Sequence, residues 1–168
     1  MPEDDPEIFA TYLHFICTNE FCVLPNTNGE TQKEVKDSHL MTQMSLVRLY
    51  VLAEKLQDVK SKDGILRGII KNCHIVHPPD DMRYLLGADP IAVLYKGTPK
   101  GSMARRIAVE YKAWEGNAAN ITSVEWPKEF LAELAFELMT FGQCEHDKKA
   151  PYWRRDHPEK YMEEESEE

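Results

Sequence analysis

The sequence predicts a mainly α-helical fold, and three observations support this prediction. Apolar residues recur at intervals of three and four over several stretches, which is the spacing of one face of an α-helix. Good helix formers fill these stretches, and proline or glycine stands near their ends. Apolar residues make up 42% of the 168 residues and charged residues 29%, which is typical of a globular protein with a sizeable core.

The first helix is expected over residues 4–18. Asp5 can cap this helix, and Pro6 suits its first turn. Its apolar face is broad enough to imply burial on more than one side, and consists of Ile8, Phe9, Tyr12, Leu13, Phe15 and Ile16. Residues 21–24 form a short apolar run, so at most one short strand is expected there. Residues 26–38 are polar and are interpreted as a loop.

Two further helices are expected at residues 40–57 and 60–73. The first of these is apolar almost all round and is built from good helix formers. The second turns one set of side chains inward, namely Ile65, Leu66, Ile69, Ile70 and Cys73. Gly64 and Gly68 would each weaken that helix by about 1 kcal/mol relative to alanine, so they indicate close packing or a frayed start.

Three shorter helices are expected after the prolines at positions 78 and 79. One begins at Asp89, one is capped by Ser102, and the last begins near Trp126 and is stopped by Gly142. The expected organisation is therefore a helical region at 1–77, a second helical region packed on it at 80–142, and a charged tail without regular structure at 143–168.

Charge and composition exclude several classes of partner. A net charge of −9 disfavours nucleic acid, because the phosphates would repel an acidic chain. No apolar run approaches the roughly 20 residues of a membrane helix, so no membrane partner is expected. The acidic start lacks the basic and apolar parts of a secretory signal. We therefore expect an intracellular protein, in the cytoplasm or the nucleus and not secreted, with its four cysteines as free thiols.

Several segments, in this order, resemble the later part of a BTB/POZ domain of the fungal type. Residues 2–9 resemble the entry to a helix of that domain, and Cys17-Thr18-Asn19 stands where Tyr-Thr-Gly is usual. Residues 49–57 and 58–73 match the two helices that follow. The similarity continues through 98–102, Arg105-Arg106, Trp114-Glu115 and Tyr161. The front half of such a domain would precede Met1, so the resemblance implies that the helical region at 1–77 is a partial BTB/POZ domain.

The resemblance implies a non-enzymatic module that binds other proteins and needs no cofactor. Members of the family dimerise, and many deliver substrates to cullin-type ubiquitin ligases, so an adaptor or scaffold role and a cullin partner are implied. The family's dimer helix and its hydrophobic-X-Glu element lie in the front half, so homodimerisation is not expected here. The partner-facing surface implied by the matched helix and the loop after it consists of Tyr12, Phe15, Asn19, Glu20 and Phe21.

Two alternatives stay open. The chain could be a truncated or degenerate product without a function of its own, since the match begins in the middle of the family's domain. It could also be a small metal- or thiol-dependent protein, because Cys73-His74 lies near His77 and Cys144 lies near His146. Zinc sites need about four ligands at paired short spacings, and this spacing is irregular, so a buried structural cysteine at 73 is favoured and no metal site is assigned.

Overall fold

A computed structural model of the chain describes residues 5–18, 20, 31–77, 82–115, 121, 125–143 and 162. It is mainly helical, which confirms the predicted fold class. The elements in chain order are α1 (Pro6–Thr18), α2 (Gln32–Leu56), α3 (Val59–His74), β1 (Val76–His77), β2 (Met82–Arg83), α4 (Ala88–Gly97), α5 (Met103–Glu115) and α7 (Lys128–Gln143).

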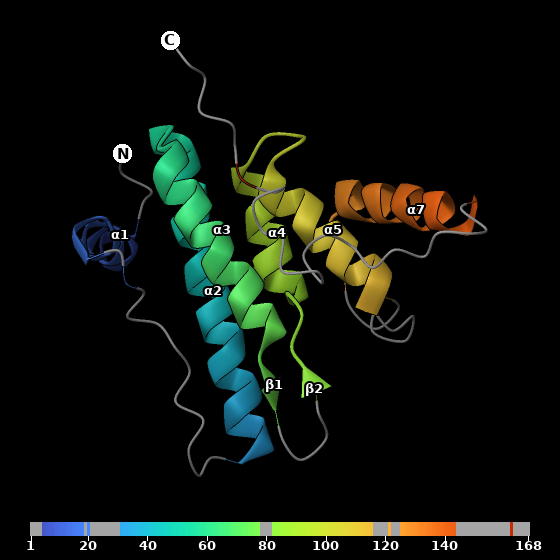
Figure 1. Cartoon of the computed structure of the whole chain (residues 1–168), viewed down its shortest axis with the longest axis horizontal. Helices are drawn as coiled ribbons and strands as arrows, with labels where there is room; N and C mark the ends of the chain where they lie inside the picture. The colour runs from blue at the N-terminus through green and yellow to red at the C-terminus, as the bar shows by residue number, and fades with distance from the viewer. Residues whose placement is uncertain are drawn as a thin grey trace.

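The helices are arranged around α2. This helix contacts α1, α3 and α4, while α5 contacts both α4 and α7 (Figure 1). As a result α1 lies at one side of the molecule and α7 at the opposite side. One continuous apolar core joins all six of these helices, from Tyr12 of α1 to Leu134 of α7. The region that begins at residue 82 therefore packs on the region before it, mainly through α4 on α2.

Helix α2 begins eight residues before the helix that the sequence predicts at 40–57. Residues 32–38 were interpreted as part of a loop, but they form the first two turns of this helix. The reason is a capping box: the Thr31 hydroxyl accepts a hydrogen bond from the Glu34 N–H at 3.4 Å, and the Glu34 carboxylate accepts one from the Thr31 N–H at 2.8 Å. Val35 and His39 then bury their side chains, which gives the extra turns a packed face.

A two-stranded antiparallel pair joins α3 to α4. Val76 of β1 faces Arg83 of β2, and His77 faces Met82. The expectation of at most one short strand, near residues 21–24, does not include this pair, and residues 21–24 lie outside the described residues. Strands of two residues leave no periodic apolar signal, which is why the sequence did not indicate them.

The predicted inward face of α3 is confirmed. All five residues of that set are buried. Gly64 on the same helix meets the ring of Phe15, since a Cβ at position 64 would lie 2.6 Å from Phe15 Cζ. Close packing is therefore the correct explanation for this glycine. At the other end of the chain, α7 is described as far as Gln143, one residue past the stop predicted at Gly142.

The described part of the chain contains no helix with both the length and the apolar character that crossing a bilayer requires. The predicted tail at 143–168 lies outside the described residues, except for Gln143 and Met162. Met162 is partly buried and packs against the core.

Candidate functional site

The broad apolar face of α1 is divided between the core and the solvent. Tyr12 and Phe15 are buried, with exposed fractions of 3% and 4%. Phe9, Leu13 and Ile16 keep 45%, 48% and 50% of their side chains exposed. These three residues stand at positions i, i+4 and i+7 and therefore share one face of the helix. We call this set the α1 stripe.

A hydrogen bond fixes which side of α1 turns inward. The Tyr12 hydroxyl donates to Oδ2 of Asp58 at 2.6 Å. Asp58 is the N-cap of α3, where its carboxylate also accepts from the Ser61 N–H at 3.0 Å and from the Ser61 hydroxyl at 2.6 Å. The carboxylate thus serves two helices at once, and α1 is held with the α1 stripe outward.

The two ionisable groups of this contact have shifted pKa values. Burial, together with the hydrogen bond to Asp58, raises the pKa of Tyr12 to about 12. Burial acts to raise the pKa of Asp58 as well, but the hydrogen bonds from Ser61 and Tyr12 outweigh it and lower that pKa. At neutral pH the pair is therefore a neutral phenol bonded to a charged carboxylate.

The structure divides the five predicted partner-facing residues into three groups. Tyr12 and Phe15 are core residues in this structure, so they hold α1 in place and are not accessible to a partner. Glu20 is exposed, and its N–H donates to the Thr18 hydroxyl at 3.2 Å. Asn19 and Phe21 lie outside the described residues. The sequence-based prediction did not name the α1 stripe as a surface. The breadth of the apolar face of this helix was the feature that could have indicated it.

A groove of about 540 Å³ lies beside α1, where α1, α2 and α4 meet. Its lining combines exposed basic side chains with buried and half-buried apolar side chains. The lining residues are Asp5, Ile8, Arg48, Val51, Leu52, Lys55, Val93, Lys96 and Gly97. Across its α1 side, Arg48 and Asp5 form an ion pair at 3.5 Å, and each side chain is nearly half exposed.

A second exposed apolar surface lies on α7. Leu131, Phe136, Leu138 and Met139 are exposed there, with Phe136 at 68%. Leu131 and Leu138 are seven positions apart and share one face, while Phe136 and Met139 lie on the adjoining face, so this surface is broader than the α1 stripe. The inner side of α7 packs on α5 through Phe130 and Leu134, which are buried.

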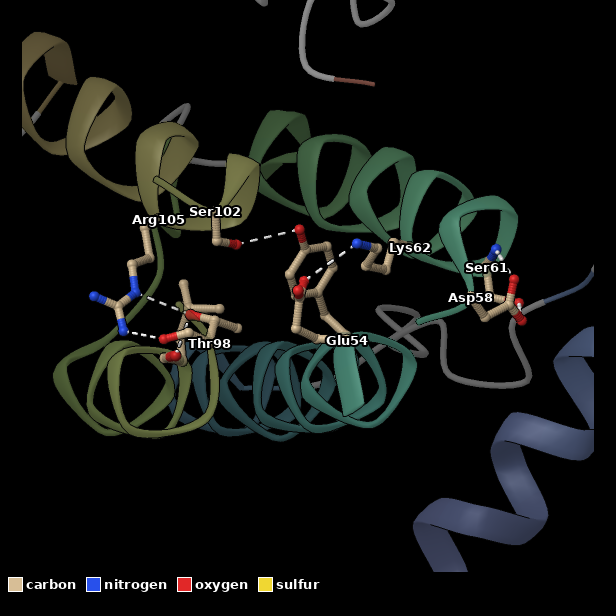
Figure 2. A network of polar contacts seen from close by, with 9 residues as sticks. Glu54, Asp58, Ser61, Lys62, Thr98, Ser102 and Arg105 are labelled. Atoms are coloured by element: carbon tan, nitrogen blue, oxygen red, sulfur yellow. Dashed lines mark hydrogen bonds and ion pairs between the residues drawn. The ribbon is translucent and has the colours of Figure 1, made fainter. Parts of the chain in front are cut away.

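The buried polar side chains of the centre are engaged in holding the helices together. Arg105 stacks 4.3 Å above the ring of Tyr95 and donates to the carbonyl oxygen of Tyr95. It also donates to the hydroxyl and carbonyl oxygens of Thr98 at the end of α4 (Figure 2). Nearby, Lys62 and Glu54 form an ion pair at 3.4 Å. Figure 2 shows these groups between the helices, where Arg105 links α5 to α4 and Lys62 links α3 to α2.

The thiols were the other candidate for chemistry. Cys73 is buried, and burial raises the pKa of its thiol to about 12, which is opposite to the change that activates a nucleophile. Cys17 is exposed on α1. Among the residues that the structure describes, no three His, Cys, Asp or Glu side chains gather as a metal site would require. The side chain of His77, together with Cys144 and His146, lies outside those residues.

Comparison of the chain with family models, with curated proteins and with solved structures found no match. The resemblance to the BTB/POZ family consequently stays a prediction from the sequence. The candidate site is defined by the chain's own features alone: a helix with an anchored inner face and an exposed apolar stripe, and a basic groove next to it.

Proposed function

We propose that this chain is a non-enzymatic protein-interaction module of the BTB/POZ type, and that the α1 stripe is its partner-facing surface. The single observation that carries the proposal is the division of α1 into a buried side and an exposed side. Tyr12 is bonded to Asp58 on the inner side, while Phe9, Leu13 and Ile16 remain in solvent on the outer side.

The spacing of the α1 stripe suits a helix that inserts into a groove of another protein. Helix-in-groove complexes use anchors at i, i+3 or i+4, and i+7, and the α1 stripe has large apolar residues at three such positions. Burying half-exposed leucine, isoleucine and phenylalanine side chains contributes roughly 25 cal/mol for each Å² removed from water. Binding to a partner would therefore bury the α1 stripe.

The absence of catalysis is part of the proposal and has its own support. The described thiol in the core has a raised pKa, and the buried charged groups Arg105, Lys62 and Glu54 bond to the fold itself. The finer role, adaptor or scaffold for a cullin-type ubiquitin ligase, comes from the sequence resemblance alone. A purified cullin would test this role directly: lack of binding would remove it and leave the interaction module itself in place.

The general proposal is tested by charge insertion in the α1 stripe. The double variant Leu13→Asp/Ile16→Asp is compared with Met41→Asp, which changes an exposed apolar residue of α2. Each full-length protein is expressed in cells, captured, and its co-purifying proteins are quantified by mass spectrometry. We expect the α1 variant to lose at least one specific partner that both the wild type and Met41→Asp retain.

Circular dichroism separates loss of binding from loss of folding. All three substituted residues are exposed, so both variants should keep the helical spectrum of the wild type. If the folded Leu13→Asp/Ile16→Asp variant retains every partner of the wild type, the α1 stripe is not the interaction surface and the proposal is wrong.

A further inference from the structure

We infer that the groove between α1, α2 and α4 is a docking site for an acidic, amphipathic helical segment of a protein partner. This inference rests on the proposed interaction function and adds to it the chemistry of a ligand. The groove is separate from the α1 stripe, since it is lined on the α1 side by Asp5 and Ile8.

The first support is the arrangement of charge around apolar lining residues. Arg48 and Lys55 stand seven residues apart on α2, which is about 10 Å along the helix axis. Between them lie Val51 and Leu52. Lys96 of α4 also lines the groove. Exposed cations thus flank an apolar centre made from the same helix.

The second support is the contrast between the groove and the rest of the chain. The chain carries a net charge of −9, yet the groove is lined by three cationic side chains and a single carboxylate. Acidic residues on the same helices, such as Glu54 of α2 and Asp89 of α4, are not among the described residues that line it. A local positive site on an acidic protein concentrates acidic ligands and repels them elsewhere.

The contact between Asp5 and Arg48 shows how a ligand would enter. It is a surface ion pair at 3.5 Å between side chains that are 43% and 47% exposed. Pairs of this kind hold weakly because water screens them. A carboxylate from a partner can therefore take the place of Asp5 on Arg48 without breaking a buried contact.

These positions specify the pattern of the ligand. Acidic residues at i and i+7 match the separation of Arg48 and Lys55, and would exchange with the contacts that both side chains already make. Apolar residues at i+3 and i+4 face the half-buried apolar lining, which consists of Ile8, Val51 and Val93. A helix presents all four on one face. A nucleic acid is a poorer fit, because its continuous phosphates would meet the overall negative charge and gain nothing from the apolar lining.

The test uses a fluorescein-labelled helical peptide of about 15 residues, with Glu at i and i+7 and Leu at i+3 and i+4. Binding to the full-length protein is followed by fluorescence anisotropy. A second peptide, with Lys in place of Glu, is the ligand control. We expect the acidic peptide to bind, the basic peptide to bind far more weakly, and binding to weaken when the salt concentration rises.

Charge changes in the protein locate the site. We expect affinity for the acidic peptide to fall in the order wild type, Arg48→Gln/Lys96→Gln, Arg48→Glu/Lys96→Glu, with a total loss of about tenfold or more. Lys33→Glu/Lys36→Glu is the matched control, since it reverses two exposed charges on α2 that do not line the groove, and should bind as the wild type does. Circular dichroism confirms that each variant is folded.

Two results would overturn the inference: no binding of the acidic peptide up to about millimolar concentration, or binding that the Arg48 and Lys96 changes leave unaltered. Displacement of the peptide by inorganic phosphate, but not by sodium chloride of equal ionic strength, would also overturn it by revealing a site for small anions. These failures differ from failure of the proposed function, which depends on the partners lost by Leu13→Asp/Ile16→Asp. The co-purification experiment can show loss of those partners whether or not the peptide binds in the anisotropy experiment.

Discussion

The phenol of Tyr12 and the carboxylate of Asp58 lie 2.6 Å apart, and through this hydrogen bond the first helix is attached to the cap of the third. The two residues are 46 positions apart in the sequence. Because Asp58 also holds the first turn of α3 through Ser61, the contact couples the start of one helix to the orientation of another. Together with the burial of Tyr12 and Phe15, it holds α1 with the α1 stripe toward solvent.

Removing the Tyr12 hydroxyl should loosen α1 and leave the remaining core intact. We expect Tyr12→Phe to lower the free energy of unfolding by about 1 kcal/mol, since one hydrogen bond to a charged acceptor is lost while Asp58 keeps its bonds to Ser61. Amide hydrogen exchange should accelerate in α1 and stay unchanged in α3. Thr11→Val is the control, because the Thr11 hydroxyl donates within its own helix, to the carbonyl oxygen of Glu7. Equal acceleration in both helices would contradict the role given to this contact.

The same pair predicts a pH dependence on both sides of neutrality. The pKa of Asp58 is lowered in the folded state, so its contribution to stability is present above its ordinary pKa of about 4 and is lost as the pH falls through the folded value. The pKa of Tyr12 is raised to about 12, so its contribution is present below its ordinary value and is lost as the pH rises toward 12. Thermal unfolding of the wild type and Asp58→Asn across pH should show their difference shrinking in acid. A constant difference would contradict this assignment.

Gly64→Ala should destabilise the protein even though alanine favours helix by about 1 kcal/mol. The added methyl would lie 2.6 Å from Cζ of the buried Phe15 ring, and overpacking of this kind costs about 1–3 kcal/mol. Replacing Phe15 with leucine makes room, so Gly64→Ala should be less harmful, or stabilising, in a Phe15→Leu background. A denaturant double-mutant cycle measures this coupling. If the two changes are additive, α1 does not pack on α3 in the way described.

The two described cysteines should differ strongly in reactivity. Cys17 is exposed on α1, whereas Cys73 is buried and has a pKa raised to about 12 by that burial. We expect a maleimide at neutral pH to label Cys17 rapidly and Cys73 only after unfolding. Peptide mapping by mass spectrometry assigns the label to each position. Labelling of Cys73 in the native protein at the rate of Cys17 would show that the core is open there.

The sequence predicted each of the helices described above, except for the first two turns of α2, but not which face of α1 is covered. The inward set of α3, from Ile65 to Cys73, follows from periodicity alone because that helix has a single apolar face. In α1 the apolar face is wider than one neighbour can bury, and periodicity cannot say which half is covered. That depends on Asp58 and Gly64, which are far from Tyr12 and Phe15 in the sequence.

Two other features show which parts of a structure a single sequence can predict and which it cannot. The start of α2 could have been predicted from Thr31 and Glu34, which have the spacing of a capping box. The polar composition of the segment favoured a loop instead. The basic groove could not be predicted from the sequence, because Lys96 comes close to Arg48 and Lys55 only when α4 packs on α2. Single-sequence patterns describe elements, and this site arises from the packing of three of them.

Photo-crosslinking from the α1 stripe tests the central claim most directly. A photoreactive phenylalanine analogue is placed at Leu13 in the full-length protein, with the same analogue at Met41 of α2 as the control, since both side chains are exposed. After illumination in cells, we expect a discrete adduct with a second protein from position 13 and none of that mass from position 41. The same adducts from both positions, or none from position 13, would contradict the assignment of the exposed face of α1 as the surface that binds a partner.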